Sequence, residues 1–127
     1  DIQQNLTSLG VPAHLAKSFW DVTRENIDTL NDLSVWWDIF SQGAEPVIDK
    51  ADHKFVEKAL SVLPPEPFDE STWSKWTEEV KQLTGRKGRE LFMPLRLALT
   101  GKERGPDMSK VLPLLQNIKA KQILDGG

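Results

Sequence analysis

Apolar residues recur at three- and four-residue intervals through most of the chain, a spacing that predicts an all-helical protein. Stripes of this kind run through residues 11–26, 31–41 and 49–63, and β-branched residues never alternate with polar ones over the length of a strand. The second stripe contains the adjacent pair Trp36 and Trp37. Neighbouring residues cannot share one face of a helix, so we expect one indole to point inward and the other to contact a neighbouring helix.

Residues with capping chemistry mark several helix boundaries. Asn31 or Asp32 is expected to cap the second helix, and Gly43 is expected to end it. Ser71 is expected to cap a fourth helix that ends at Gly85. The buried stripe of this fourth helix is predicted to consist of Trp73, Trp76, Val80 and Leu83.

The clearest break in the chain is Pro64-Pro65-Glu66-Pro67, because three prolines in four residues cannot continue a helix. We expect this break to separate two helical subdomains. The predicted division is an upstream subdomain at 1–63, a proline-rich connector at 64–71 and a C-terminal subdomain at 72–127.

Proline positions leave one alternative open in the C-terminal part. Pro94 either opens a helix at its first turn or lies inside a longer, kinked helix that starts near Gly88. Pro106 is expected in the first turn of a helix over residues 107–116, and residues 117–124 are expected to form a short last helix.

Composition allows a real core and excludes several chemistries. Five tryptophans and 39% hydrophobic residues suffice to bury one, and the absence of cysteine excludes disulfides, thiolate zinc sites and a cysteine nucleophile. His14 and His53 have no ligand partner in the pattern beyond Asp49, so no metal site is predicted. No apolar run reaches the roughly 20 residues that cross a bilayer. Since the chain starts at Asp1 without Met, we expect it to be a piece of a longer protein.

Charge is distributed unevenly along the chain. Seven basic and three acidic residues lie between Arg86 and Lys110, which gives this window a net charge of +4 in a chain whose total is -3. A local positive field on an acidic body indicates a face that binds a polyanion. The alternative is a solvated, basic helical surface, in which Arg96 would pair with Glu90, Glu103 or Asp107.

Several motifs in this window are distinctive in combination. They are Thr84-Gly85-Arg86-Lys87-Gly88, Leu91-Phe92-Met93-Pro94-Leu95-Arg96-Leu97-Ala98-Leu99-Thr100-Gly101, Gly105-Pro106 and Leu112-Pro113-Leu114-Leu115. Together they resemble the C-terminal anticodon-binding region of bacterial glutamyl-tRNA synthetase, a class I aminoacyl-tRNA synthetase. The likeness covers most of the chain and is strongest between residues 72 and 115.

The resemblance implies an all-α, compact bundle of about six to seven helices, with the catalytic domain absent from this chain. The parent protein would be a cytoplasmic ligase that attaches glutamate to tRNA(Glu) with ATP and Mg, while this piece would contain no catalytic residue and no cofactor. Its expected partners are the tRNA(Glu) anticodon loop and the catalytic domain of the same polypeptide. Neither a membrane nor a second copy is expected as a partner.

The resemblance also implies site residues. In the family, anticodon bases are read by the arginine of the PLR segment and by the loop after ALTG, which correspond here to Arg96, Gly105, Pro106 and Met108. A second arginine of the family helps to recognise the first anticodon base, and its position corresponds here to Arg24 or Asn26. Weaker contacts to phosphates are expected from Arg86, Lys87, Arg89, Lys102 and Arg104.

A competing hypothesis is a stand-alone helical module that binds a protein and no longer binds tRNA. It requires exposed tryptophans, such as Trp36 or Trp37, in a contact patch. A small hydrolase, the third class considered, has no support in the sequence because no nucleophile-elbow motif is present.

Overall fold

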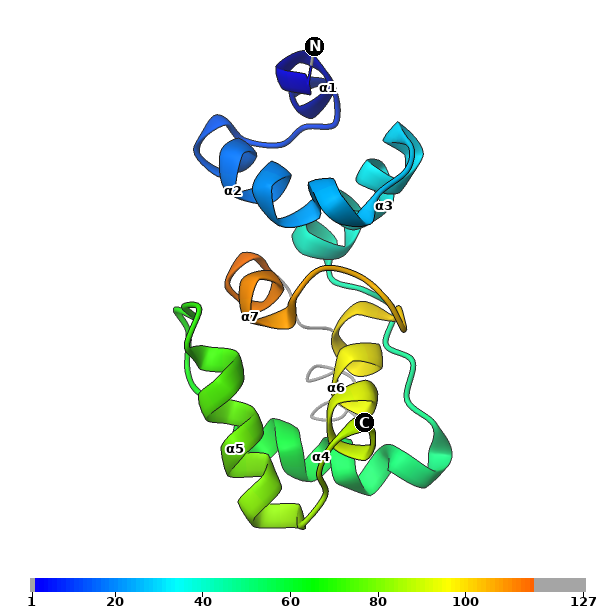
Figure 1. Cartoon of the computed structure of the whole chain (residues 1–127), viewed down its shortest axis with the longest axis vertical. Coiled ribbons are helices and arrows are strands. Elements are labelled where there is room, and N and C mark those ends of the chain that lie inside the picture. The colour runs from blue at the N-terminus through cyan, green and yellow to red at the C-terminus, as the bar shows by residue number, and fades with distance from the viewer. Residues whose placement is uncertain (1, 116–127) are drawn as a thin grey trace.

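The computed structural model describes residues 2–115 and is all-helical over that range, as the sequence predicts (Figure 1). It contains seven α-helices and three short 3-10 helices, and no strand is present among these residues. The α-helices are α1 (Ile2–Ser8), α2 (Ala13–Thr23), α3 (Leu30–Gln42), α4 (His53–Ser61), α5 (Thr72–Thr84), α6 (Arg89–Thr100) and α7 (Met108–Val111). The 3-10 helices are η1 (Arg24–Asn26), η2 (Lys50–Asp52) and η3 (Leu112–Leu114).

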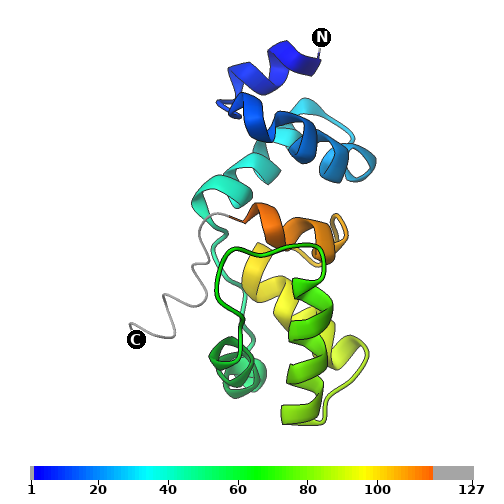
Figure 2. The same cartoon turned by 90° about the vertical axis from the view of Figure 1, so that its left-hand side faces the viewer.

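The helices form two groups along the long axis of the molecule (Figures 1 and 2). The upper group consists of α1, α2 and α3, and the lower group consists of α4, α5, α6 and α7. The segment between the groups is tied to α6, because the Val47 N–H donates to the carbonyl of Leu97 at 3.0 Å. Buried apolar residues of both groups belong to one continuous hydrophobic cluster.

Helix α4 belongs by packing with the helices that follow the proline-rich segment. It contacts α5 and α6, and the indole N–H of Trp76 in α5 donates to the backbone carbonyl of Ala59 in α4 at 2.8 Å. Trp76 itself is fully buried. The expected division into residues 1–63 and 72–127 stays a prediction about how the chain is organised.

Helix α3 starts earlier than the sequence predicts. Its cap is Thr29, whose hydroxyl accepts from the N–H of Asp32, while the Asp32 carboxylate accepts from the N–H of Thr29. The prediction of Asn31 or Asp32 as the cap was therefore wrong, because the two side chains form a reciprocal capping box in which Asp32 is the third helical residue. The expected end at Gly43 is confirmed, and this glycine has a φ of 80°.

The adjacent tryptophans of α3 point in different directions, as expected. Trp36 is buried, whereas Trp37 is half-buried and meets Phe19 of α2 edge to face, with ring centroids 5.3 Å apart. Neither indole is exposed on the surface. These two residues therefore do not form the patch of exposed tryptophans that the protein-binding hypothesis requires.

Helix α5 has the predicted boundaries but different local chemistry. Ser71 stands at the cap position without capping the helix, because its hydroxyl and N–H both donate to the Asp69 carboxylate. Gly85 ends the helix in the left-handed conformation, as expected. Leu83 is half exposed and does not belong to the buried stripe, which corrects the prediction for this residue.

Helix α6 begins at Arg89, directly after Gly88, so Pro94 lies inside the helix. Of the two alternatives for Pro94, the second is therefore confirmed in its position: the proline lies inside a helix that starts next to Gly88. Helix α6 ends at Gly101, which has a φ of 70°.

The C-terminal helix is shorter than predicted. Asp107 is the cap of α7 and not its first residue, because its carboxylate accepts from the N–H of Ser109 at 2.9 Å. Pro106 therefore precedes the helix, and the expectation that it lies in the first turn was wrong. The chain tightens to a 3-10 helix after Val111, since Pro113 has no N–H to continue an α-helix. The helix predicted over residues 117–124 lies outside the described residues.

Candidate nucleic-acid interface

The side chain of Arg96 joins α6 to the turn that precedes α7. Its Nη2 donates to the backbone carbonyl of Pro106 at 2.9 Å. A Cβ atom added at Gly105 would lie 3.2 Å from Nη1 of the same guanidinium. The structure thus brings together Arg96 and the Gly105-Pro106 turn, the residues that the family resemblance singled out.

Arg96 is a partly buried cation without a carboxylate partner. Burial lowers the pKa of its guanidinium from the usual value, and the charge of Asp107 acts in the opposite direction. The group stays protonated, because an arginine side chain is not deprotonated in proteins. Within residues 2–115, no carboxylate lies at ion-pair distance from it, so the predicted alternative of pairing with Glu90, Glu103 or Asp107 is not formed. Its Nη1 is buried and has no hydrogen-bond partner.

The guanidinium lines a groove of about 340 Å³ that we call the aromatic groove. The groove is formed by α5, α6 and the start of α7, and its lining residues are Trp73, Phe92, Met93, Arg96, Asp107 and Met108. The rings of Trp73 and Phe92 lie 6.3 Å apart between centroids with a tilt of 36°. Phe92 is 44% exposed, although it is a large apolar residue. Flat apolar faces beside a cation are the surroundings in which single-stranded bases bind.

Asp107 gives the aromatic groove a negative group beside the positive one. Hydrogen bonds from the N–H and the hydroxyl of Ser109 lower the pKa of this carboxyl, so it is ionised at neutral pH. A groove with one cation and one carboxylate is a poor site for a bare phosphate, because the carboxylate repels it. The arrangement suits a neutral, planar group whose edge has both donors and acceptors, which is the chemistry of a nucleobase.

The other predicted base-reading residues lie around Arg96 in different ways. Pro106 and Met108 are buried, so Met108 contributes to the lining of the aromatic groove and not to its rim. Gly105 is half-buried at the turn. Arg24 and Asn26 lie in η1 of the upper group, exposed, with the Arg24 guanidinium 5.9 Å from the centre of the Trp20 ring.

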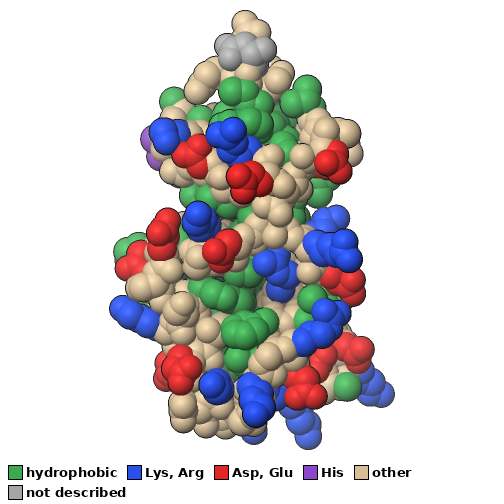
Figure 3. Space-filling view, viewed as in Figure 1, with side chains coloured by type: hydrophobic (Ala, Val, Ile, Leu, Met, Phe, Trp, Pro, Cys, Tyr) green, Lys and Arg blue, Asp and Glu red, His purple; other side chains and the backbone are tan. Residues whose placement is uncertain are grey.

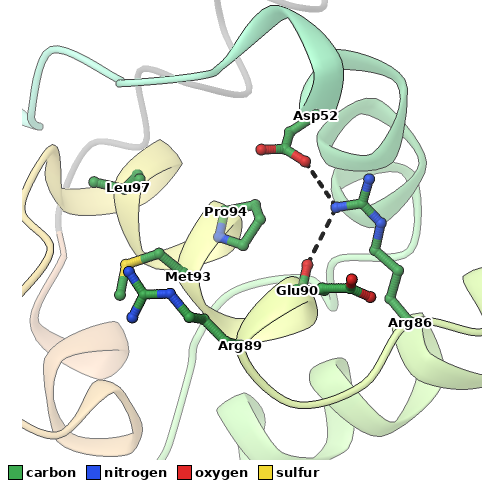
Figure 4. Close-up of a pocket in the computed structure, with 7 residues that line it drawn as sticks. All are labelled: Asp52, Arg86, Arg89, Glu90, Met93, Pro94 and Leu97. Atoms are coloured by element: carbon green, nitrogen blue, oxygen red, sulfur yellow. Dashed lines mark hydrogen bonds and ion pairs between the residues drawn. The ribbon is translucent and has the colours of Figure 1, made fainter.

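Of the five predicted phosphate contacts, Arg86 has the most partners within the protein. Its Nη1 is 2.8 Å from Oδ1 of Asp52 and 3.1 Å from the backbone carbonyl oxygen of Glu90, and its guanidinium lies 4.2 Å from the centre of the Phe55 ring. Arg86, Asp52 and Glu90 border a second pocket of about 410 Å³, which Arg89 also lines (Figure 4).

The remaining four predicted phosphate contacts are exposed. They are Lys87, Arg89, Lys102 and Arg104. Figure 3 shows basic and acidic side chains interspersed on one face of the molecule, with apolar side chains exposed between them. This face of the molecule is therefore mixed in charge and has no purely basic surface.

Trp73 and Phe92 are site residues that the sequence interpretation missed. Both were assigned to apolar helix stripes, because tryptophan and phenylalanine at helical spacing usually form core. The sequence contained one indication of a role for Phe92. It lies four residues before Arg96, so the two side chains share one face of the helix.

His14 and His53 are both exposed, and residues 2–115 contain no group of three acidic or histidine side chains that could hold a metal ion. None of the helices in this range has the length and apolar character that crossing a bilayer requires.

An all-helical fold with an arginine, two partly open aromatic rings and a carboxylate in one groove has the features of a helical nucleic-acid-binding domain. Comparison with protein families identifies the particular kind. The family model for the anticodon binding domain matches residues 7–122, and the chain belongs to this family. The resemblance inferred from the sequence is thereby confirmed.

Curated relatives agree with the family model. The chain is 57% identical over 122 residues to glutamate–tRNA ligase 1 of Roseobacter denitrificans, covering 96% of this chain and 28% of that protein. It is 52% identical over 121 residues to glutamate–tRNA ligase 1 of Paracoccus denitrificans, covering 95% and 27% of the two chains. It is 50% identical over 120 residues to glutamate–tRNA ligase 2 of Ruegeria sp., covering 94% and 27%. The chain thus spans little more than a quarter of the length of these relatives. No solved structure matches it.

Proposed function

We propose that this chain is the anticodon-recognition part of a glutamate–tRNA ligase, an enzyme that attaches glutamate to tRNA(Glu) with ATP. The family model and the names of the relatives support the proposal. The structural observation that carries it is Arg96, a partly buried cation without an ion-pair partner among the described residues, which lines an open groove beside two aromatic rings.

In this proposal the aromatic groove receives an unpaired base of the anticodon loop. The exposed face of Phe92 and the neighbouring Trp73 ring supply a surface for stacking, an interaction that contributes about 1–3 kcal/mol per base. The guanidinium of Arg96 donates to acceptors on the edge of the base, and the carboxylate of Asp107 accepts from its amino group. The Gly105-Pro106 turn presents backbone to the same base.

Phosphates of the loop are bound outside the groove. Lys87, Arg89, Lys102 and Arg104 are exposed and free to move toward the RNA backbone. Each single-strand phosphate that is neutralised changes the slope of log K against log salt by roughly -0.7. Arg86 contributes less, since its guanidinium is already engaged with Asp52 and Glu90.

The rest of the reaction belongs to other parts of the polypeptide. A catalytic domain binds ATP and Mg and forms the activated glutamate, while this chain alone binds tRNA without catalysing a reaction. The partners are then the tRNA(Glu) anticodon loop and that catalytic domain, in a cytoplasmic, monomeric enzyme.

The test is binding of the 127-residue chain to an RNA stem-loop that carries the glutamate anticodon. Arg96→Ala is expected to weaken binding by roughly 1–3 kcal/mol and to reduce discrimination against a changed anticodon base. Lys54→Ala, an exposed cation of α4, is the matched control and should leave binding close to wild type. An Arg96→Ala chain that binds like wild type at several salt concentrations would contradict the proposal.

A further inference from the structure

Gly105 lies directly against the indole of Trp36. A Cβ atom added at Gly105 would lie 2.5 Å from both Cζ2 and Cη2 of the ring, closer than any side chain tolerates. Gly105 is not among the glycines with a positive φ, so its backbone conformation is open to other residues. The absence of a side chain at position 105 is therefore required by the ring of Trp36 and not by the turn.

This contact connects the two helix groups. Trp36 belongs to α3 of the upper group, and Gly105 lies in the connection between α6 and α7, which passes next to α3 (Figure 1). The upper group therefore reaches the turn that directly precedes Asp107, a lining residue of the aromatic groove.

The Arg96 guanidinium and the indole of Trp36 both lie next to the position that a Cβ atom at Gly105 would take. Its Nη1 lies 3.2 Å from the Cβ atom added at Gly105, and it is buried without a hydrogen-bond partner. Nη2, in contrast, donates to the carbonyl of Pro106. Since no hydrogen bond holds Nη1, its place depends on packing at the Gly105 turn, next to which the indole edge also lies.

The indole itself is held firmly by the core of the upper group. Trp36 is buried and meets Phe40 edge to face, with ring centroids 6.1 Å apart. Phe40 is fully buried and meets Phe19 of α2 in the same way at 5.3 Å. A chain of packed aromatic rings thus extends from α2 to the Gly105 turn, next to which the guanidinium of Arg96 also lies.

We propose that Trp36 is a positioning residue for RNA recognition, one that fixes the Arg96 guanidinium and the Gly105-Pro106 turn for an unpaired base. This inference rests on the proposed function and adds a residue from the upper group to it. The benzo edge of the indole occupies the space that a side chain at position 105 would fill. With a smaller ring at position 36, the Gly105 turn and the guanidinium beside it lose this support, and the bond from Nη2 to the Pro106 carbonyl is left to hold the guanidinium. The groove itself keeps all its lining residues.

A double-mutant cycle in the 127-residue chain tests this role. The variants are Trp36→Phe, Arg96→Ala and the double variant, and the probes are a fluorescein-labelled stem-loop with the glutamate anticodon and the same stem with altered loop bases. Trp36→Phe should weaken binding of the glutamate loop about tenfold, the effect of misplacing one hydrogen bond to a charged donor, and should change binding of the altered loop little. Added to Arg96→Ala, it should cause no further loss, because its effect passes through the arginine.

A second pair of variants provides a rescue. Gly105→Ala should weaken binding because its Cβ displaces the indole, whereas Gly105→Ala combined with Trp36→Phe should bind more tightly than Gly105→Ala alone, since the smaller ring vacates the space. Thermal unfolding of each variant sets a temperature at which all are folded, so that loss of structure does not contribute to the affinities.

The outcomes separate this inference from the proposed function. Additive effects of Trp36→Phe and Arg96→Ala, or equal weakening for both RNAs, would overturn the positioning role and leave the function standing. A wild-type chain that binds neither RNA would overturn both.

Discussion

Arg86 donates a hydrogen bond from Nη1 to the backbone carbonyl oxygen of Glu90, at 3.1 Å. This is the carbonyl that Pro94, four residues further along α6, leaves without its helical partner, because proline has no N–H. The same nitrogen lies 2.8 Å from the Asp52 carboxylate (Figure 4). One guanidinium thus compensates for a proline inside a helix and joins α6 to the segment before α4.

Arg86→Met is predicted to destabilise the chain. It removes the bond to the Glu90 carbonyl, the partly exposed ion pair with Asp52 and the contact with the Phe55 ring, which together should cost about 1–3 kcal/mol. Urea unfolding measures the loss, and Arg89→Met, an exposed neighbour, should change the free energy of unfolding by less than about 0.5 kcal/mol.

A second substitution tests the reason for that loss. Pro94→Ala restores an N–H that can donate to the Glu90 carbonyl, so it should stabilise the Arg86→Met chain more than it stabilises wild type. Equal effects of Pro94→Ala in both backgrounds would show that the carbonyl does not depend on Arg86.

Phe92→Ala is predicted to separate RNA binding from stability. The ring is 44% exposed, so its removal should cost little free energy of unfolding, while the loss of a stacking surface should weaken binding of the anticodon stem-loop by about 1–3 kcal/mol. Leu83→Ala, which removes a similarly exposed apolar side chain of α5 that does not line the aromatic groove, is the control. Binding that falls equally in both variants would argue against stacking on Phe92.

Gly101→Ala is predicted to be more damaging than Gly85→Ala, although both glycines end a helix in the left-handed conformation. The added methyl at Gly85 meets open space, so only the backbone cost of about 1–2 kcal/mol is expected there. At Gly101 the methyl would also lie 2.9 Å from the backbone oxygen of Glu45, which forces the segment between the two helix groups to move. Thermal unfolding of the two variants compares them directly, and equal stability losses would contradict the clash.

The pH dependence of stability should decrease in Asp107→Asn. The bonds from Ser109 lower the folded-state pKa of Asp107, and a lowered pKa means that the carboxylate stabilises the fold at a pH above its unfolded-state pKa. That contribution is lost as the pH falls below about 4 and through the folded-state pKa. Asparagine keeps an acceptor for the Ser109 N–H but does not titrate, so the chain should lose less stability between about pH 5 and about pH 2.

Other carboxyls also contribute to the acid dependence, so the expected change is partial. Asp32 and Asp69 have lowered pKa values through hydrogen bonds of their own, and both remain in the variant. Asp107→Ala serves as the second variant, because it removes the cap as well and should cost about 1 kcal/mol at neutral pH. If the free energy of unfolding falls with decreasing pH as steeply in Asp107→Asn as in wild type, the Asp107 carboxylate does not contribute to the pH dependence of stability.

The hydrophobic pattern predicted most of the helices because packing follows their apolar faces. The opposite orientations of Trp36 and Trp37, and the helix ends at Gly43 and Gly85, needed only local rules. Helix α1 was not predicted, since this seven-residue helix has little periodicity to detect and gains stability when Leu6 is buried against the rest of the chain.

Errors at the helix ends came from competing local chemistries. Pro106 suits a first helical turn, but Asp107 binds the N–H of Ser109 and shifts the start of α7 beyond both residues. Thr29 and Asp32 are likewise both good caps, and only their reciprocal hydrogen bonds show which one starts α3.

The candidate site was accessible to sequence reasoning only in part. The motif around Arg96 indicated the arginine and the turn, whereas Phe92 looked like core because an apolar residue in a helix stripe carries no sign of what will cover it. The meeting of Trp36 with Gly105 joins residues far apart in the chain, so no local pattern could predict it.

The hydrogen bond between Trp76 and the carbonyl of Ala59 limits how far the protein can be truncated from its N-terminal side. A truncated protein that starts after the prolines would expose the underside of α5 and α6 to water and lose the hydrogen bond between the Trp76 indole and Ala59, which costs about 0.5–1.5 kcal/mol before any lost packing is counted. A minimal RNA-binding fragment therefore has to retain α4, and the first practical starting point lies in the segment that precedes η2.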